Sequence, residues 1–154
     1  MLLRSLLLLL IATVLVSGCG GSGTPSVEEF SDAVVLNRNR VDFALTRITR
    51  ADSSDELLNR MDEAAAVIDK AAGDLAGVGA RSDYQPEADR LTKSLRQLSV
   101  DIQATADQAR IPGFETLLSG EGFQGLSFDS WTDANKALAG LAGKGIPVAI
   151  LQPR

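Results

Sequence analysis

The residue with the most reactive side chain in this sequence is Cys19, the only cysteine among its 154 residues. A thiolate is a nucleophile, so a lone cysteine predicts either covalent chemistry or a small, buried and inert thiol. Cys19 directly follows an apolar run, Leu6 to Val16 and two small residues, and directly precedes Gly-Gly-Ser-Gly-Thr-Pro. Because this glycine-rich segment cannot belong to a hydrophobic core, we expect the thiol to be covalently modified.

The segment before Cys19 has the three parts of a secretory leader. Arg4 supplies a positive charge, Leu6 to Val16 form the apolar stretch, and small residues end it. A helix of that length rises only about 16 Å, roughly half of the hydrocarbon core, so it is too short to span a membrane. We therefore expect a signal peptide that is cut between Gly18 and Cys19.

The residues Val16-Ser17-Gly18-Cys19 resemble the lipobox of bacterial lipoproteins, which consists of an aliphatic residue, two small residues and a cysteine. The resemblance implies that the Cys19 thiol is alkylated with diacylglycerol and that the lipoprotein signal peptidase cuts before this residue. Two or more acyl chains hold a protein firmly, at ~0.8 kcal/mol per buried methylene. The resemblance therefore implies a lipid anchor, such as palmitate, at the extracytoplasmic face of the cell membrane.

Histidine, a residue type common in catalytic and metal sites, is missing from the chain, and cysteine occurs once. The chain has no histidine, so Ser-His-Asp and Cys-His nucleophiles and the Glu-x-x-His motifs of di-iron bundles are excluded. Zinc sites built from cysteine and histidine fail for the same reason. Glu115 and Glu121 are a remaining carboxylate pair, which we interpret as solvated loop acids. We expect no enzyme activity, no catalytic residue, no metal and no cofactor.

The chain is acidic, with a net charge of −5 that becomes −6 when the leader removes Arg4. Phosphates and anionic headgroups repel such a surface, so we expect no nucleic-acid partner and a domain that stands off the membrane. The 136 residues after the leader are enough for one core. The predicted organisation is a signal peptide at 1–18, a lipidated cysteine with a flexible tether at 19–26, and a helical-bundle domain at 27–154.

Apolar residues recur at alternating steps of three and four, which places them on one face of a helix. They do so along three long segments, which are Val27 to Ile48, Leu58 to Leu75 and Ala88 to Ala109, and along a short one from Trp131 to Leu141. Short connections make sequential helices antiparallel neighbours. The pattern predicts an all-α fold: an up-down antiparallel bundle of three long helices plus a short fourth. The C-terminal tail, with two prolines, should lie extended along a groove.

Local signals mark the ends of these helices. Pro86 suits a first helical turn, and Gly79 suits the end of the second helix. Charges across the first connection lead us to expect Arg40 level with Glu63. Three Ser-x-x-acid spacings predict capping boxes, which satisfy the free N–H groups at a helix start. They are Ser26 with Glu29, Ser53 with Glu56, and Ser130 with Asp133.

Asn37 is a polar residue on the apolar seam of the first helix. One such residue commonly sets the register of a bundle at some cost in stability. In an antiparallel arrangement we expect it level with Ala65 or Ile68. Two interpretations stay open: a register device with local water, or a small pocket beside Ala65 that holds a ligand.

The long segment Ile111 to Phe128 is the strongest candidate for a specific function. Loops of this length are uncommon in compact domains, and its aromatic residues argue against disorder. It could cap the end of the bundle as a lid, or expose a surface for an envelope protein partner. The predicted partner surface consists of Phe114, Leu117, Phe123, Phe128 and Trp131.

These features favour a membrane-anchored exported lipoprotein with a non-catalytic scaffolding or interaction role in the cell envelope. The alternative is an extracytoplasmic small-molecule sensor or carrier with its ligand between the helices near Asn37 and Ala65, which needs an enclosed cavity of roughly 300 Å³. The segment 127–148 also loosely resembles the C-terminal helix of small actinobacterial lipoproteins, a resemblance that implies no known activity.

Overall fold

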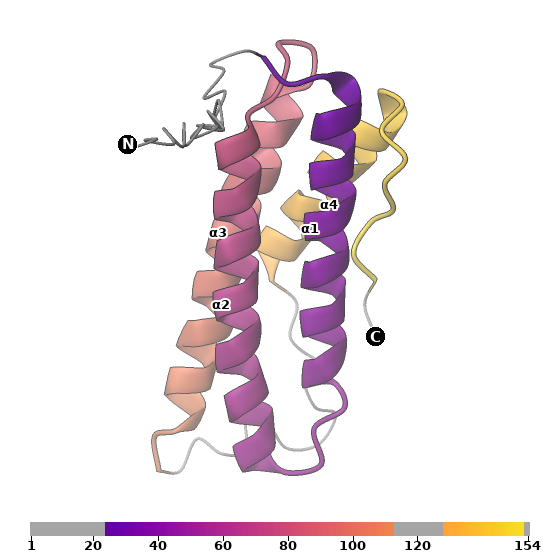
Figure 1. The fold of residues 1–154 in the computed structure, drawn as a ribbon. Coiled ribbons are helices and arrows are strands. Elements are labelled where there is room, and N and C mark those ends of the chain that lie inside the picture. Colours follow the sequence, from indigo (N-terminus) through magenta and orange to yellow (C-terminus); the bar gives the residue numbers. More distant parts are fainter. Residues whose placement is uncertain (1–23, 113–127, 153–154) are drawn as a thin grey trace, which may run out of the picture.

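A computed structural model describes residues 24–112 and 128–152, and all regular secondary structure in these ranges is helical (Figure 1). The long helices are α1 (Val27–Ile48), α2 (Ser54–Val78) and α3 (Gln85–Ala109), and the short one is α4 (Asp129–Gly143). Helix α2 packs against α1 and α3, and α3 also packs against α4. Consecutive helices run in opposite directions. The predicted all-α, up-down bundle of three long helices plus a short fourth is therefore confirmed.

The apolar stripes of the four helices meet in one core. Each stripe follows the predicted spacing of three and four, so every helix turns a single face inward. Burying a side chain of valine, leucine or isoleucine size stabilises the fold by about 1.5–3 kcal/mol each, which makes this packing the main source of stability. The largest fully buried helical side chains are Phe30, Val34, Val41, Ile48, Met61, Ile68, Leu98, Ile102, Leu138 and Leu141.

The first two helices begin with serine caps, as their spacing predicted. The Glu29 N–H donates to Ser26 Oγ at 3.1 Å, and the Ser26 N–H donates to the Glu29 carboxylate at 2.8 Å, which completes a capping box. At α2 the Glu56 N–H donates to Ser53 Oγ at 3.2 Å. The Glu56 carboxylate, however, accepts from the N–H of Asp52 at 2.9 Å rather than from Ser53. The second box is thus displaced by one residue on its carboxylate side.

The third predicted capping box, Ser130 with Asp133, is wrong. Helix α4 already begins at Asp129, so Ser130 lies inside its first turn and is buried. The Ser130 hydroxyl donates to the Asp101 carboxylate of α3 at 2.5 Å. A contact with a neighbouring helix therefore uses the hydroxyl that a local cap would have used, and it docks the start of α4 on α3.

The C-terminal tail lies extended beside α1, as expected (Figure 1). Gly145 has a φ of +93°, a conformation that glycine adopts without strain, and the chain reverses there after α4. Ile146 and Leu151 are buried in the core. Asn135 binds both backbone groups of Leu151, donating to its carbonyl at 3.1 Å and accepting from its N–H at 2.7 Å. From the other side, Arg38 of α1 donates to two tail carbonyls at 3.1 and 2.5 Å.

The ion pairs between α1 and α2 differ from the expected register. Glu63 pairs with Arg47 at 2.8 Å, whereas Arg40 pairs with Asp74 at 3.1 Å. The prediction that Arg40 lies level with Glu63 is therefore wrong. Side chains on a helix lean toward its N-terminus. In an antiparallel pair they lean in opposite directions along the bundle. An arginine of α1 consequently meets an acid of α2 that lies farther from the connection than equal spacing predicts.

Candidate functional site

A groove on the outer surface between α1 and α2 is the strongest candidate site. It has a volume of about 340 Å³, with alanines of both helices and Val67 among the residues that line it. Phe43 lines it while remaining 65% exposed, the largest exposure of any large apolar side chain in the described ranges. We call it the Phe43 groove; its lining residues are Arg40, Phe43, Ala44, Arg47, Arg60, Glu63, Ala64, Val67, Lys70 and Ala71.

The helical repeat of α1 explains why Phe43 points outward. Val41, Ala44 and Ile48 belong to the buried stripe of this helix. Phe43 lies two residues after Val41, which is about 200° around the helix axis, so burying the stripe turns Phe43 to the surface. The spacing of apolar residues does not single out Phe43 as a site residue. The available signal was a large aromatic residue off the apolar stripe.

Two ion pairs cross from α1 to α2 on either side of Phe43 along α1. Arg47 binds Glu63 at 2.8 Å, and Arg40 binds Asp74 at 3.1 Å. Lys70 also binds Asp74 at 2.9 Å. The hydrogen bond from Lys70, followed by the charges of Lys70 and Arg40, lowers the pKa of the Asp74 carboxyl. Exposed pairs of this kind stabilise a fold by only ~0–1 kcal/mol each, so they mainly hold the long side chains that frame the groove.

Arg60 closes the end of the groove near the connection between α1 and α2. Its guanidinium donates to the backbone carbonyl of Arg47 at 2.6 Å and pairs with Glu56 within its own helix. The N–H of Asp52 is the main cause that lowers the pKa of Glu56, with the Arg60 charge adding to it. Four cationic side chains but only one carboxylate, Glu63, line the groove. Asp74 and Glu56, which pair with the other three cations, adjoin the groove, so its four cationic side chains stand against three carboxylates and leave a small local excess of positive charge.

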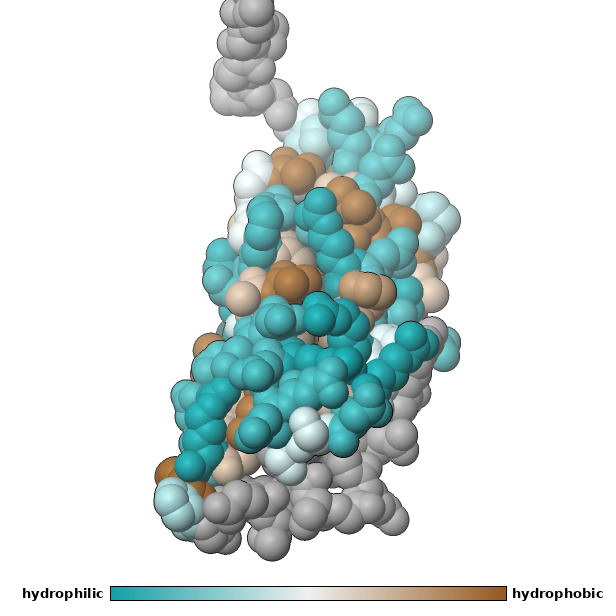
Figure 2. All heavy atoms as spheres, turned by 60° about the horizontal axis from the view of Figure 1, so that its bottom comes forward, coloured by the Kyte–Doolittle hydropathy of each residue, from teal (hydrophilic) through white to brown (hydrophobic). Residues whose placement is uncertain are grey.

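An apolar floor with a cationic rim can bind an apolar group that stands next to negative charge. On the face of the molecule that Figure 2 shows, apolar residues form separate patches between hydrophilic side chains. Within residues 24–112 and 128–152, no group of three or more histidine, cysteine, aspartate or glutamate side chains could hold a metal ion. The arrangement suits recognition of a partner.

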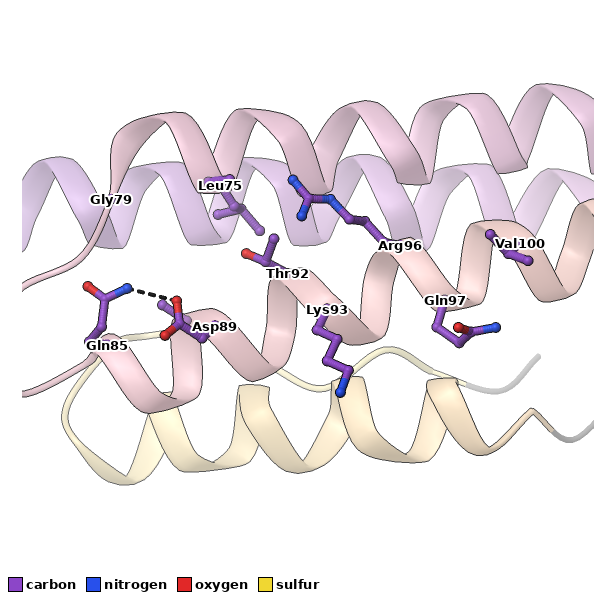
Figure 3. Close-up of a pocket in the computed structure, with 11 residues that line it drawn as sticks. Leu75, Gly79, Gln85, Asp89, Thr92, Lys93, Arg96, Gln97 and Val100 are labelled. Atoms are coloured by element: carbon purple, nitrogen blue, oxygen red, sulfur yellow. Dashed lines mark hydrogen bonds between the residues drawn. The ribbon is translucent and has the colours of Figure 1, made fainter.

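A second, more polar groove lies between α2 and α3 (Figure 3). It has a volume of about 430 Å³. Arg96 extends from α3 toward α2, and Gln85 donates to Asp89 at 2.8 Å. Val100, which is 58% exposed, lines this groove and also an acidic hollow of about 530 Å³ farther along the same two helices.

Asn37 is buried, as its seam position predicted, and its amide is satisfied by protein groups. It donates to the carbonyl four residues earlier in α1 at 2.9 Å and accepts from Arg40 at 3.3 Å. The same Arg40 nitrogen binds Asp74 of α2 at 3.1 Å, so Arg40 bridges Asn37 and Asp74. Neither Asn37 nor Ala65 lines the Phe43 groove.

The carbonyl of Ala65 has a different neighbour. It accepts from the Ser99 hydroxyl of α3 at 2.8 Å, a buried contact that joins the two helices. In the described part of the chain, every buried side-chain nitrogen and oxygen has a hydrogen-bond partner. The polar interior of the bundle thus holds no side-chain group that calls for a ligand.

The predicted partner surface is described only in part. Phe128 and Trp131 are half-buried and pack against the core at the start of α4. Phe114, Leu117 and Phe123 lie outside the described residues, as do Gly18, Cys19 and the acids Glu115 and Glu121. None of the four helices described has the length and apolar content that a membrane crossing needs.

Comparison with known proteins adds no relative. No family model, no curated protein and no solved structure matches this chain.

Proposed function

We propose that this protein is an exported, lipid-anchored interaction protein of the bacterial cell envelope, without catalytic activity, that docks a partner protein in the Phe43 groove. The anchor is supported by the short apolar leader and the lipobox Val16-Ser17-Gly18-Cys19. The docking role is carried by one observation: Phe43 remains 65% exposed beside an apolar hollow.

An exposed aromatic side chain in such a hollow is suited to be a binding hot spot. Burying a phenylalanine contributes about 1.5–3 kcal/mol, and aromatic and arginine residues dominate the energetics of protein interfaces. Arg40 and Arg47 stand on either side of Phe43 along α1, and Lys70 lies across the groove. Because the four cations that line the groove outnumber the three carboxylates that pair with them, we assign the groove to a partner segment that presents an apolar side chain between acidic residues.

A second copy of this chain fits the Phe43 groove poorly. Pairing the groove with itself would bring Arg40, Arg47, Arg60 and Lys70 of both copies together, and like charges in an interface cost binding energy. The expected occupant is therefore a different protein of the cell envelope.

Site-specific photo-crosslinking in cells that produce the full chain tests the docking role. A benzoylphenylalanine at position 43 should give one discrete adduct, with the attached peptide carrying an apolar residue between acidic ones. The same group at Ile150, which is 44% exposed on the tail, is the matched control and should give none. Lys70→Glu should reduce the adduct at position 43, because it removes one of the attracting charges. Equal adducts at both positions, or none at position 43, would contradict the proposal.

The anchor has a separate test. Cys19→Ser should abolish labelling of the protein by radioactive palmitate and leave the leader uncut, because the thioether can no longer form. Palmitate labelling that persists in this variant would show that the lipobox interpretation is incorrect.

A small-molecule sensor or carrier is the second candidate, favoured by the volume of the Phe43 groove. About 340 Å³ lies within the range of ligand pockets, although neither Asn37 nor Ala65, the predicted pocket residues, lines this groove. Native mass spectrometry of the full chain distinguishes the two roles. A bound small molecule that disappears with Phe43→Ala would favour the carrier over the interaction protein.

A further inference from the structure

The outer face of α3 carries a regular pattern that the Phe43 groove does not use. Lys93, Val100 and Asp107 are spaced by seven residues, so they lie on one side of the helix. All three are exposed, and Val100 is 58% exposed although it is a large apolar residue in the middle of a helix. We call these three residues, together with Arg96 and Ala104, the Val100 face.

The charges on this face are arranged in opposite signs about Val100. Lys93 and Arg96 line the groove at one end, and no ion pair holds either of them within the described part of the chain. Asp107 lies at the other end, where Asp62 of α2 also faces the hollow. Arg110 pairs with both of these acids, with Asp107 at 2.9 Å, so this end carries two negative charges and one positive charge. Figure 3 shows Arg96 and Lys93 extending in different directions from α3, with Val100 farther along the same helix.

We propose that the Val100 face pairs with the same face of a second copy, with the two α3 helices antiparallel and a two-fold axis at Val100. In this arrangement each residue before Val100 in one copy faces the residue that lies equally far after Val100 in the other copy. Lys93 then faces Asp107 of the other copy, and Val100 faces its own equivalent. Arg96 comes within reach of Asp62 of the other copy.

The charge pattern selects the antiparallel orientation. A parallel pairing would place Lys93 against Lys93 and Asp107 against Asp107, which is repulsive at both ends. The antiparallel pairing turns both repulsions into attractions, and its symmetry uses each attraction twice. Ala104 is small and exposed, so it allows the helices to approach each other beside the central Val100 pair. This proposal is independent of the Phe43 groove, which lies on the opposite side of α2.

A disulfide between two copies tests the position of the axis. Val100→Cys in the full chain, on membranes oxidised with copper phenanthroline, should give a covalent dimer, because a disulfide needs Cα atoms within about 7 Å. Leu36→Cys on α1 is the matched control, since Leu36 is 51% exposed and lies off this face. The unsubstituted chain reports any contribution from Cys19. A dimer yield from Val100→Cys no greater than that from Leu36→Cys would overturn the proposal.

Charge exchange tests the orientation. Adding Lys93→Asp to Val100→Cys should lower the dimer fraction at least about fivefold, because two attractions become two repulsions. Adding Asp107→Lys as well should restore it, because the pairs are re-formed with their signs exchanged. Thermal melting by circular dichroism verifies that each variant is folded. A dimer fraction that Lys93→Asp leaves unchanged, or that the double exchange does not restore in folded protein, would refute the antiparallel pairing.

Discussion

Shortening one side chain of the tail, in Leu151→Ala, tests whether the last residues belong to the core. Leu151 is fully buried, and Asn135 binds both its N–H and its carbonyl, so the backbone there is held in place and cannot easily collapse into a cavity. Buried Leu→Ala changes cost about 2.7–5 kcal/mol, and the rigid surroundings place this one near 3 kcal/mol or above. With an unfolding entropy of about 2 cal/mol/K per residue over about 130 residues, 3 kcal/mol lowers Tm by about 11 °C.

The assay is thermal and urea unfolding of the full chain, followed by circular dichroism at 222 nm. Ile150→Ala is the matched control: Ile150 precedes Leu151 but is 44% exposed, so its truncation should change stability by less than about 0.5 kcal/mol. If the two variants melt at the same temperature, the tail is not part of the cooperative unit, and the reasoning from its buried contacts fails.

Three further predictions concern stability, each measured by the same unfolding assay. Asn37→Leu should raise Tm, because the amide bonds only within α1 and leaves no buried partner unpaired; a loss above about 1 kcal/mol would reveal a required network. Gly73→Ala should stabilise by about 0.5–1 kcal/mol, because nothing lies within 4 Å of the new methyl group. Gly140→Ala should gain nothing, because its Cβ would stand 2.9 Å from Cγ of Glu87; equal gains at both glycines would contradict this. Acid should destabilise the fold, since hydrogen bonds lower the folded-state pKa of Glu87 from 4.5 and of Asp74 from 3.8. Their contribution is complete above those values and is lost as pH falls through the folded pKa, so stability that is constant from pH 6 to 3 would refute it.

The helical bundle followed from the sequence because its main cause is local. Steps of three and four place residues such as Val34 and Val41 on one helix face whatever else the chain does, and burial of that face is the largest stabilising contribution. Ser26 with Glu29 formed a complete capping box for the same reason: both partners lie within one turn. Ser130 departed from its local pattern because α4 already begins at Asp129, and the Ser130 hydroxyl donates to Asp101 of another helix.

The candidate site was less predictable because it depends on the lateral placement of helices. Asn37 was predicted to lie on the buried seam, and it is buried, but its contact with Arg40, which also binds Asp74, follows from how α1 and α2 pack. The lean of the side chains, which sequence spacing alone does not include, shifts the ion pairs between α1 and α2 away from equal spacing. Phe43 was not predicted as a site residue, because an aromatic residue off the apolar stripe lines a groove only where a second helix packs beside it.

The sequence by itself determined the four helices of the described residues and the face that each of them buries, because these depend on neighbours within a few turns of chain. Only the tertiary structure decided which outward residues lie together. Phe43 and Val67 line the same groove from two helices, and the tail fits between α1 and α4 through Arg38 and Asn135. Such contacts join residues far apart in the chain, and their geometry is set by how whole helices pack, lean and rotate against one another.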